Sequence, residues 1–532
     1  MKGDFSQWYF NRKDNFAGVL HQQGRVLLDS DWNAQTQIIN DWQDTAGQDI
    51  IGAGVAAVPA ETPNAFKVVQ AKKIDDDRVQ ITLLPGRIWA DGILVHLNES
   101  SDIYRIATYL QSPIQNSPTI PIANSRDAVI MEVWRESING FQMPETLIEP
   151  ALGGPDTTER VLTSMRFRLL RLATDEDCHN ITDKLKDGVD NKGKLKVSLQ
   201  ETIETGGDCP VVEGGGYTGF EHQLYRIEIA QVNDDVPMFK WSQFNGGLVG
   251  RGKCDLGSPD QKITLTANDQ AIKMSGLTDF YLEVIQWDEE QGFWRVTYGA
   301  EVTLNGDTLE VANERYVDVE SDLPSGTVFF RLWNGISAIA SFPKVTPPAE
   351  PNLLRDGIRL EFDNPNTTYY RSGDYWTFKV RAGEIVNDEI LINNKPPQGI
   401  EYHRVPLAEL NWDADLDISF EDEQIEDCRD VFRPLTQQNG CCTFVVGDGK
   451  ISHGDFDSIE QALRHLPKSG GKICLLPGLH EANAIIKGKR NIKIEGCGKH
   501  TRVIPRKETR NSSIFRIIDS ECIALLDMDL VT

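Results

Sequence analysis

The stretches FKVVQ (residues 66–70) and VQITLLPGRIWADGILVHL (residues 79–97) decide the fold class, because apolar and polar side chains alternate along them. Alternation with a period of two is typical of β-strands that are buried on one face. Asp91-Gly92 separates two apolar runs, and an Asp-Gly pair in that position predicts a tight hairpin turn. The sequence therefore predicts a mainly β chain from residue 66 onward.

The same pattern continues along most of the chain. AVIMEVWRE (128–136) and YRIEIAQV (225–232) predict further strands. Residues 158–170 predict a helix, and residues 174–220 predict an exposed loop because they are polar and rich in glycine. Closely spaced alternating runs across 260–345 predict a small sandwich or barrel.

A helix is predicted ahead of this β-rich part, over residues 30–50. Ser30 or Asp31 is the expected N-terminal cap, and Gly52 and Gly54 end the apolar repeat.

The C-terminal part has a different pattern. FDSIEQALRHLP (456–467) predicts a short amphipathic helix capped by Asp457 or Ser458, with Ile459 and Leu463 in its buried stripe. Short apolar runs such as KICLLPG and NIKIEGCG follow at regular spacing. Short strands after a capping helix are typical of the opening of a right-handed parallel β-helix.

We therefore predict a modular, mainly β protein with five parts. They are an N-terminal arm and helix (1–65), a β-rich module with long loops (66–250), a small β-sandwich or barrel (251–345), a β module with an acidic linker (346–439), and a capping helix with the first rungs of a β-helix (440–532).

Composition limits the choice of partner and compartment. Asp and Glu number 80 against 54 Lys and Arg, so the formal net charge is −26. Nucleic-acid and anionic-membrane partners favour a basic surface, and we expect neither.

The N-terminus has no apolar core of signal-peptide length, and no stretch predicts a membrane span, so we expect a cytoplasmic protein. Its nine cysteines are expected to be buried free thiols, without a zinc site or other cofactor.

The order of several motifs resembles an uncharacterised family. MKGDF (1–5), QGRV (23–26) and DWN (31–33) are similar to the opening of a family commonly encoded beside phage-tail-like contractile injection systems and tailed-phage baseplates. HQLYRIEIA, MFKWSQFNGG, DGIRLEF, GDYWTFKVRAG and PPQGIEYHRVPLAEL continue the resemblance. After EDCRDVFRPLTQ, the chain resembles the start of a pectate-lyase-like β-helix. The resemblance implies a structural role in an injection particle.

The expected function is therefore assembly into such a particle. The protein would be a baseplate extension or accessory subunit, with a cap or plug as the other placement, in several symmetric copies beside baseplate proteins. Aromatic side chains are dense in the N-terminal arm, and such side chains commonly anchor interfaces. The candidate interaction residues are Phe5, Trp8, Tyr9, Phe10, Phe16, Arg25 and Trp32.

Three other sites are possible in this sequence. His21, Asp29 and Asp31 form either a metal or acid–base site or simply a turn before a helix. Asp374, Tyr375, Trp376 and Lys379 form either a sugar-binding platform or core and interface aromatics.

The third candidate makes the chain a carbohydrate-binding or carbohydrate-cleaving β-helix surface protein. Asp527 and Asp529 would then lie on one side of a strand as a carboxylate pair. The enzymes with this fold place such pairs on central rungs, which this stretch lacks. We therefore predict no enzyme activity and no catalytic residue.

Overall fold

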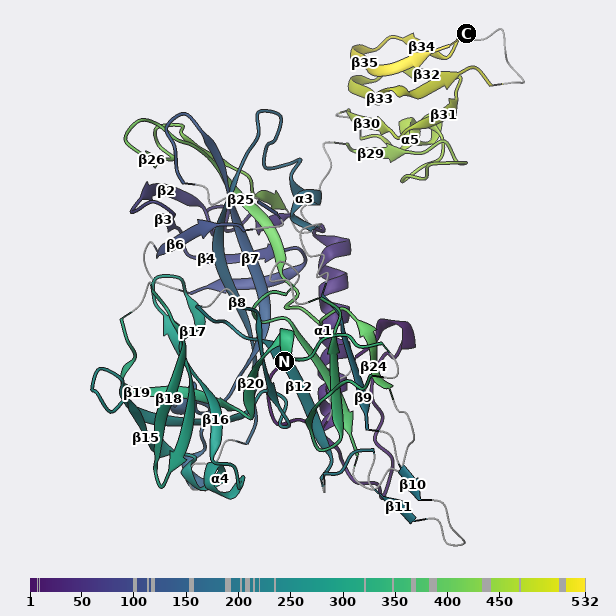
Figure 1. Cartoon of the computed structure of the whole chain (residues 1–532). Helices are drawn as coiled ribbons and strands as arrows, with labels where there is room; N and C mark the ends of the chain where they lie inside the picture. The colour runs from purple at the N-terminus through teal and green to yellow at the C-terminus, as the bar shows by residue number, and fades with distance from the viewer. Residues whose placement is uncertain are drawn as a thin grey trace. The chain divides into compact units, whose positions relative to one another are not determined.

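The computed structural model (Figure 1) describes most of the 532 residues. The described residues are all except 7, 9, 99–102, 112–113, 116–119, 153–156, 187–192, 201–202, 206–210, 214–215, 220, 234–235, 320–321, 347–348, 365–369, 382–389, 433–441, 468–469, 507–512 and 532. They form two compact units, Met1–Phe432 and Arg433–Thr532. The mainly β fold class is confirmed.

The predicted N-terminal helix is present as α1 (Asp29–Ile50). Its N-cap is Leu28, which has no side chain that can accept a hydrogen bond, so the predicted caps Ser30 and Asp31 are wrong and lie in the first turn. Gly47 is the one buried residue of α1. A Cβ there would clash with the carbonyl oxygen of Gly92, so the helix meets the β-hairpin backbone to backbone.

Two sheets share the first hydrophobic core of this unit. The larger sheet has the strand order β26-β2-β3-β6-β8-β7-β25-β27, and the smaller one β28-β1-β4-β5. The strands of the larger sheet are β2 (Val68–Lys73), β3 (Arg78–Leu83), β6 (Ile103–Tyr109), β7 (Arg126–Ile138), β8 (Arg160–Arg171), β25 (His403–Asn411), β26 (Asp417–Ser419) and β27 (Ile425–Asp427). Those of the smaller sheet are β1 (Ala56–Pro59), β4 (Gly86–Ala90), β5 (Ile93–Leu97) and β28 (Asp430–Phe432).

The predicted hairpin turn is confirmed in the smaller sheet. Ala90 pairs with Ile93, and Asp91 and Gly92 both have positive φ, at 48° and 81°. Positive φ at both central residues is what a two-residue hairpin with a type I′ turn requires.

The helix predicted over 158–170 is wrong, because this stretch is strand β8. It pairs with β7 along its whole length, from Arg160 opposite Ile138 to Arg171 opposite Asp127. Leu, Met and Arg are good helix formers, but intrinsic propensity is a small free-energy preference that long-range strand pairing overrides.

Two expected loop regions also contribute regular structure. Residues 174–220 include α3 (Thr182–Lys186), β9 (Leu195–Leu199), β10 (Ile203–Thr205) and β11 (Val211–Glu213). The acidic linker expected within 346–439 corresponds to residues 413–427. Here β26 and β27 form the two edges of the larger sheet, and their Ile418 and Ile425 are buried.

A second pair of sheets encloses an aromatic core. The orders are β20-β13-β12-β23 and β21-β22-β9-β24. The strands are β12 (Gln223–Ile229), β13 (Met238–Ser242), β20 (Gly335–Ala338), β21 (Asn352–Arg355), β22 (Ile358–Phe362), β23 (Tyr375–Val380) and β24 (Ile390–Lys395). Tyr225 stacks between Trp241 and Phe378 in this core.

A closed six-stranded barrel lies between β13 and β20 in the sequence. Its order is β14-β15-β18-β17-β16-β19, and α4 (Asp269–Met274) follows β15. The strands are β14 (Leu248–Asp255), β15 (Lys262–Ala267), β16 (Asp279–Asp288), β17 (Phe293–Asn305), β18 (Thr308–Val317) and β19 (Ser325–Trp333).

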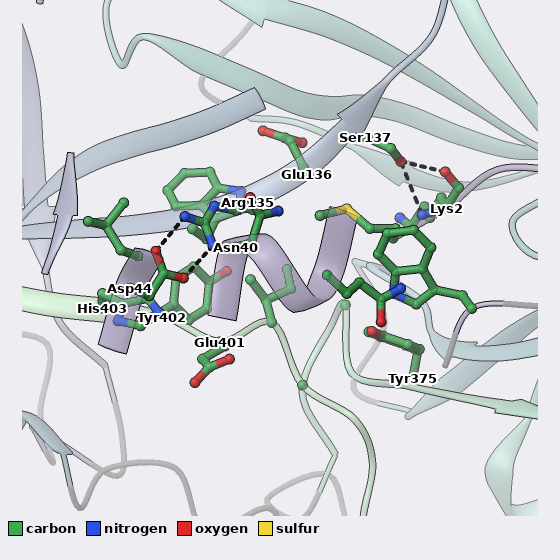
Figure 2. Close-up of a pocket in the computed structure, with 18 of the residues that line it drawn as sticks. Lys2, Asn40, Asp44, Arg135, Glu136, Ser137, Tyr375, Glu401, Tyr402 and His403 are labelled. Carbon is green, nitrogen blue, oxygen red and sulfur yellow. Dashed lines mark hydrogen bonds and ion pairs between the residues drawn. The ribbon is translucent and has the colours of Figure 1, made fainter. Parts of the chain in front are cut away.

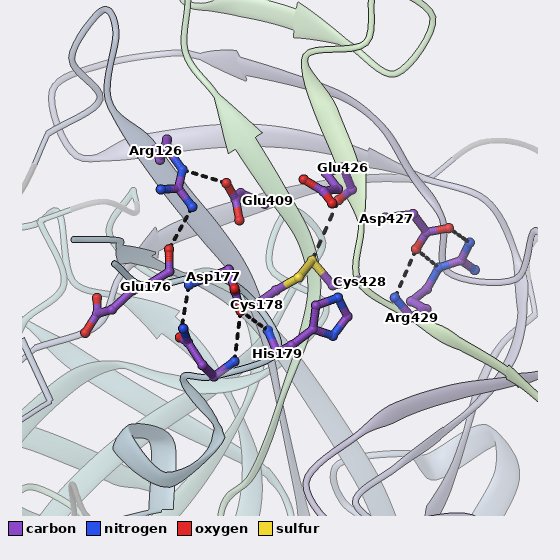
Figure 3. Close-up of a disulfide and its surroundings, with 11 residues drawn as sticks. Arg126, Glu176, Asp177, Cys178, His179, Glu409, Glu426, Asp427, Cys428 and Arg429 are labelled. Atoms are coloured by element: carbon purple, nitrogen blue, oxygen red, sulfur yellow. Dashed lines mark hydrogen bonds and ion pairs between the residues drawn. A yellow bond between two sulfur atoms is a disulfide. The ribbon is translucent and has the colours of Figure 1, made fainter. Parts of the chain in front are cut away.

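The expectation of free thiols throughout is wrong. Cys178, after β8, is joined by a disulfide to Cys428, between β27 and β28, across 250 residues of sequence (Figure 3). A second disulfide joins Cys442 to Cys474. The cysteines are scattered along the sequence, and their spacing did not reveal these pairs, because spacing in the sequence says nothing about distance in the fold.

Unit 2 contains the predicted short helix as α5 (Ile459–His465), which follows strand β29. The Ser458 side chain accepts a hydrogen bond from the Gln461 backbone N–H, which confirms one of the two expected caps. Its strands pair in parallel, β29 with β30, β30 with β33, β33 with β31 and β35, and β32 with β34. They are β29 (Phe444–Val446), β30 (Gly471–Leu475), β31 (Gly478–Glu481), β32 (Ala484–Lys487), β33 (Arg490–Ile504), β34 (Phe515–Ile518) and β35 (Glu521–Leu530).

Candidate functional site

The first three residues of the chain are held inside unit 1. The Lys2 ammonium lies 2.8 Å from a Glu228 carboxylate oxygen, and the Lys2 backbone N–H donates to Ser137 at 3.1 Å. The Gly3 N–H donates to the carbonyl oxygen of Asn245 at 3.0 Å. The arm is therefore anchored at its beginning, and residues 12–18 further along it are exposed.

Lys2 belongs to a network of ion pairs whose other members are buried. Glu228 also pairs with Arg226 at 2.7 Å and with Lys240 at 3.1 Å, and Lys240 pairs in turn with Glu283. Burial lowers the pKa of Lys2 to about 8. Burial alone would raise the pKa of Glu228, but Lys2, Lys240 and Arg226 lower it well below its usual range. Removing Lys2 would leave a buried carboxylate less well compensated, which is costly.

The arm and the outer side of α1 carry many exposed apolar side chains. Phe16 and Leu20 are 70% and 93% exposed, and Trp32 and Trp42 are 61% and 70% exposed. The large apolar residues exposed in this segment are Phe16, Leu20, Val26, Leu27, Leu28, Trp32, Ile39, Trp42 and Ile50.

Helix α1 is amphipathic, but its apolar side chains face solvent and its polar side chains face the protein body. A repeat of 3.6 residues separates its side chains into two opposite stripes. The stripe toward the protein body is polar and consists of Gln37, Asn40, Asp41, Asp44 and Gln48. The stripe toward solvent is apolar and consists of Trp32, Ile39, Trp42 and Ile50. A surface helix normally buries its apolar stripe.

The polar stripe borders a cavity of about 890 Å³ within unit 1. Figure 2 shows wall residues from the arm, from β7, from β23 and from the segment 399–404. The barrel also contributes to the wall. Half-buried aromatic side chains contribute to these walls: Trp8, Phe10, Trp294, Tyr375 and Tyr402.

Ion pairs cross the cavity wall. Both terminal nitrogens of Arg135 bind Asp44, at 2.5 and 2.7 Å, and Figure 2 shows this pair beside Asn40 and Tyr402. His403 Nδ1 lies 2.7 Å from Asp91. Burial would raise the pKa of Asp91, but His403 and the Gly54 backbone N–H lower it. Burial raises the pKa of Glu136 on the same wall.

The predicted interaction residues separate into two groups. Phe16, Arg25 and Trp32 are exposed. Phe5, Trp8 and Phe10 are partly buried, and Trp8 and Phe10 line the cavity. Tyr9 lies outside the described residues.

Residues 1–194 match a family of unknown function, DUF6519. The matched stretch contains the arm, α1 and strands β1 to β8, and it ends directly before β9. No curated protein and no solved structure matches the chain.

The alternative chemical sites are not assembled. Asp29 accepts hydrogen bonds from Ser6, and the His21 ring packs near Trp32 at 5.8 Å between centroids. Of the four residues of the possible sugar-binding platform, Asp374 and Trp376 are buried and Lys379 is exposed. The fourth, Tyr375, borders the cavity.

Asp527 and Asp529 were expected on one side of a strand, but the backbone does not alternate regularly between them. Asp527 has a φ of 49°, so β35 bends at that residue, and Asp529 lies 3.8 Å from Arg502.

Across the described ranges, no three or more His, Cys, Asp or Glu side chains are grouped to hold a metal ion. In the same ranges, none of the helices has the length and apolar content to cross a membrane.

The cavity is not visible in the sequence, because its walls come from distant segments. One signal was available: Gln37, Asn40, Asp44 and Gln48 recur at helical spacing. That pattern alone favours a solvated face, so it did not mark a site.

Proposed function

We propose that this chain is a structural subunit of a phage-tail-like contractile injection particle, as a baseplate extension or accessory subunit. A cap or plug is the second placement. In this proposal the protein is assembled in the cytoplasm, in several symmetric copies held by baseplate proteins, and it acts without a cofactor, a nucleic acid or enzymatic chemistry.

The observation that carries the proposal is the reversed polarity of α1. Its apolar stripe follows the exposed apolar residues of the arm in the sequence, so that nine large apolar side chains are exposed within residues 16–50. Exposed apolar patches mark interaction sites on folded proteins. The resemblance of the same segment to proteins encoded beside injection systems supplies the class of partner.

We also propose that unit 2 is the opening of a right-handed parallel β-helix. Its uniformly parallel pairings support this, as does the position of α5 ahead of β30. In an injection particle, a β-helix is a rigid extension and needs no catalytic site.

Substitution of the apolar stripe tests the assembly proposal. Trp32→Gln, Ile39→Gln and Trp42→Gln replace three exposed side chains, so unit 1 should remain folded. We expect the triple variant to be absent from purified particles, as measured by quantitative mass spectrometry and by electron microscopy of the particle.

The matched control replaces three apolar residues that are exposed elsewhere: Met274→Gln, Val319→Gln and Ile451→Gln. It should enter particles like the parent. Normal incorporation of the Trp32/Ile39/Trp42 variant would refute the role of α1, and absence of the parent protein from every particle would refute the function.

A further inference from the structure

The cavity beneath α1 has a size suited to a small ligand. Its volume of about 890 Å³ falls within the roughly 300–1,000 Å³ typical of ligand sites. Its mixture of rings and polar groups is unusual for space left by imperfect packing, which is normally small and apolar.

The charges of the cavity are largely satisfied by the protein itself. Five of its six guanidinium groups pair with carboxylates: Arg12 with Asp41, Arg135 with Asp44, Arg226 with Glu228, Arg295 with Asp288 and Asp318, and Arg404 with Glu132. The sixth, Arg331, donates to the carbonyl oxygen of Gly246 at 2.7 Å. An anionic ligand would have to displace these partners, so a neutral ligand fits better.

Neutral polar groups remain available on the helix side. The Gln37 side-chain nitrogen is buried and has no hydrogen-bond partner among the described residues. Asn40 lies one turn further along, on the same side of α1. Side-chain amides offer both donors and acceptors, which is what vicinal hydroxyl groups require.

Aromatic rings face the cavity from other elements. Trp8 comes from the arm, Trp294 from β17 and Tyr375 from β23. Aromatic faces pack against the C–H faces of sugar rings, which are apolar while their edges are polar. We propose that this cavity binds a neutral oligosaccharide, with Gln37 and Asn40 on its hydroxyl groups and Trp8 and Trp294 against its ring faces.

The ligand site goes beyond the assembly role, and its test uses the isolated full-length chain. Cellotriose, maltotriose and triacetylchitotriose are titrated separately by calorimetry and by tryptophan fluorescence. We expect at least one trimer to bind with a Kd below about 1 mM and to change the fluorescence, because Trp8 and Trp294 border the cavity.

A double variant, Gln37→Ala with Asn40→Ala, should bind that trimer at least about tenfold more weakly, since two hydrogen-bonding groups are lost. The control, Gln43→Ala with Thr45→Ala, changes exposed residues of the same helix outside the cavity and should bind like the parent. Both variants should melt at the parental temperature.

Several results would overturn the proposal. They are no binding of any of the three trimers at about 10 mM, equal weakening in the control, or a particle map with a segment of a neighbouring subunit in the cavity. None of the binding results bears on the assembly proposal, which depends on the opposite side of α1.

Discussion

At the scale of single residues, Glu132 and Glu136 stand four positions apart on β7 in opposite electrostatic surroundings. Glu132 is 1% exposed and lies within 2.6 Å of both Arg166 and Arg404. Burial opposes its ionisation, but these arginines and Arg168 lower its pKa to about 2. Glu136 accepts a hydrogen bond from Ser164, and burial raises its pKa.

The two shifts have opposite consequences for stability. The folded pKa of Glu132 lies below the value of 4.5 expected for the unfolded chain, so its stabilisation is complete above pH 4.5 and disappears as the pH falls toward 2. The folded pKa of Glu136 is raised, so its ionisation costs stability as the pH rises through that value.

We therefore expect Glu132→Gln to lower the free energy of unfolding at pH 7 by roughly 3–5 kcal/mol, because three half-buried arginines lose the charge of their buried partner. Glu136→Gln, the matched control, should leave it unchanged or raise it slightly. Urea unfolding followed by tryptophan fluorescence measures both, since all 11 tryptophans lie in unit 1. The Glu132 effect should shrink as the pH approaches 2, and equal losses in both variants would contradict this assignment.

At the scale of elements, the sequence predicted those whose pattern is local. The repeat over 30–50 gave α1, Asp91-Gly92 gave the β4–β5 hairpin, and Ser458 gave the start of α5. β8 was mistaken for a helix because its strand character comes from β7, which is not visible locally. The edge strands β26 and β27 were hidden for the same reason, since acidic residues flank one buried isoleucine in each.

The Cys178–Cys428 disulfide links two elements that the sequence keeps far apart. It ties the segment after β8 to the crossing between β27, in the larger sheet, and β28, in the smaller sheet. Both sulfurs belong to buried residues, at 3% and 6% exposure. A crosslink over a long loop restricts the unfolded chain, so it should stabilise unit 1.

Replacing Cys178 and Cys428 together by Ser should lower the free energy of unfolding of unit 1 by about 2–4 kcal/mol. Tryptophan fluorescence during urea unfolding again reports on unit 1 alone. A reducing agent should shift the parent midpoint toward that of the double variant and leave the variant itself unchanged. The Cys442–Cys474 pair lies in unit 2 and provides the control, because Ser at both positions should not move the fluorescence midpoint. A parental midpoint in the double variant would show that the crosslink does not stabilise the fold.

At the scale of the whole molecule, the periodicity of α1 in the sequence does not determine which of its two stripes faces the protein body. The two stripes of α1 can be read from residues 30–50, but which stripe meets the protein body depends on Gly47 and Gly92, 45 residues apart in the sequence. The usual assumption would bury the tryptophans. The structure instead exposes Trp32 and Trp42, and it directs Asp44 toward Arg135.

The exposed apolar surface and the net charge of −26 have opposing effects on self-association. Apolar contact acts at short range, whereas repulsion between like-charged chains acts over a Debye length, about 30 Å at 0.01 M salt and about 3 Å at 1 M. Repulsion should therefore dominate at low salt and keep the free chain monomeric. A scaffold that fixes neighbouring copies would overcome it and leave the apolar contacts to hold them.

Salt should then convert the free protein from monomer to oligomer through α1. We expect mass photometry to show monomers at about 0.01 M salt and growing oligomers toward 1 M, since screening removes repulsion and leaves apolar attraction. The Trp32→Gln, Ile39→Gln, Trp42→Gln variant should remain monomeric throughout, while the Met274→Gln, Val319→Gln, Ile451→Gln control should associate like the parent. A stable closed ring of the parent at low salt would contradict the need for a scaffold. Association that persists in the α1 variant would place the contact elsewhere on the molecule.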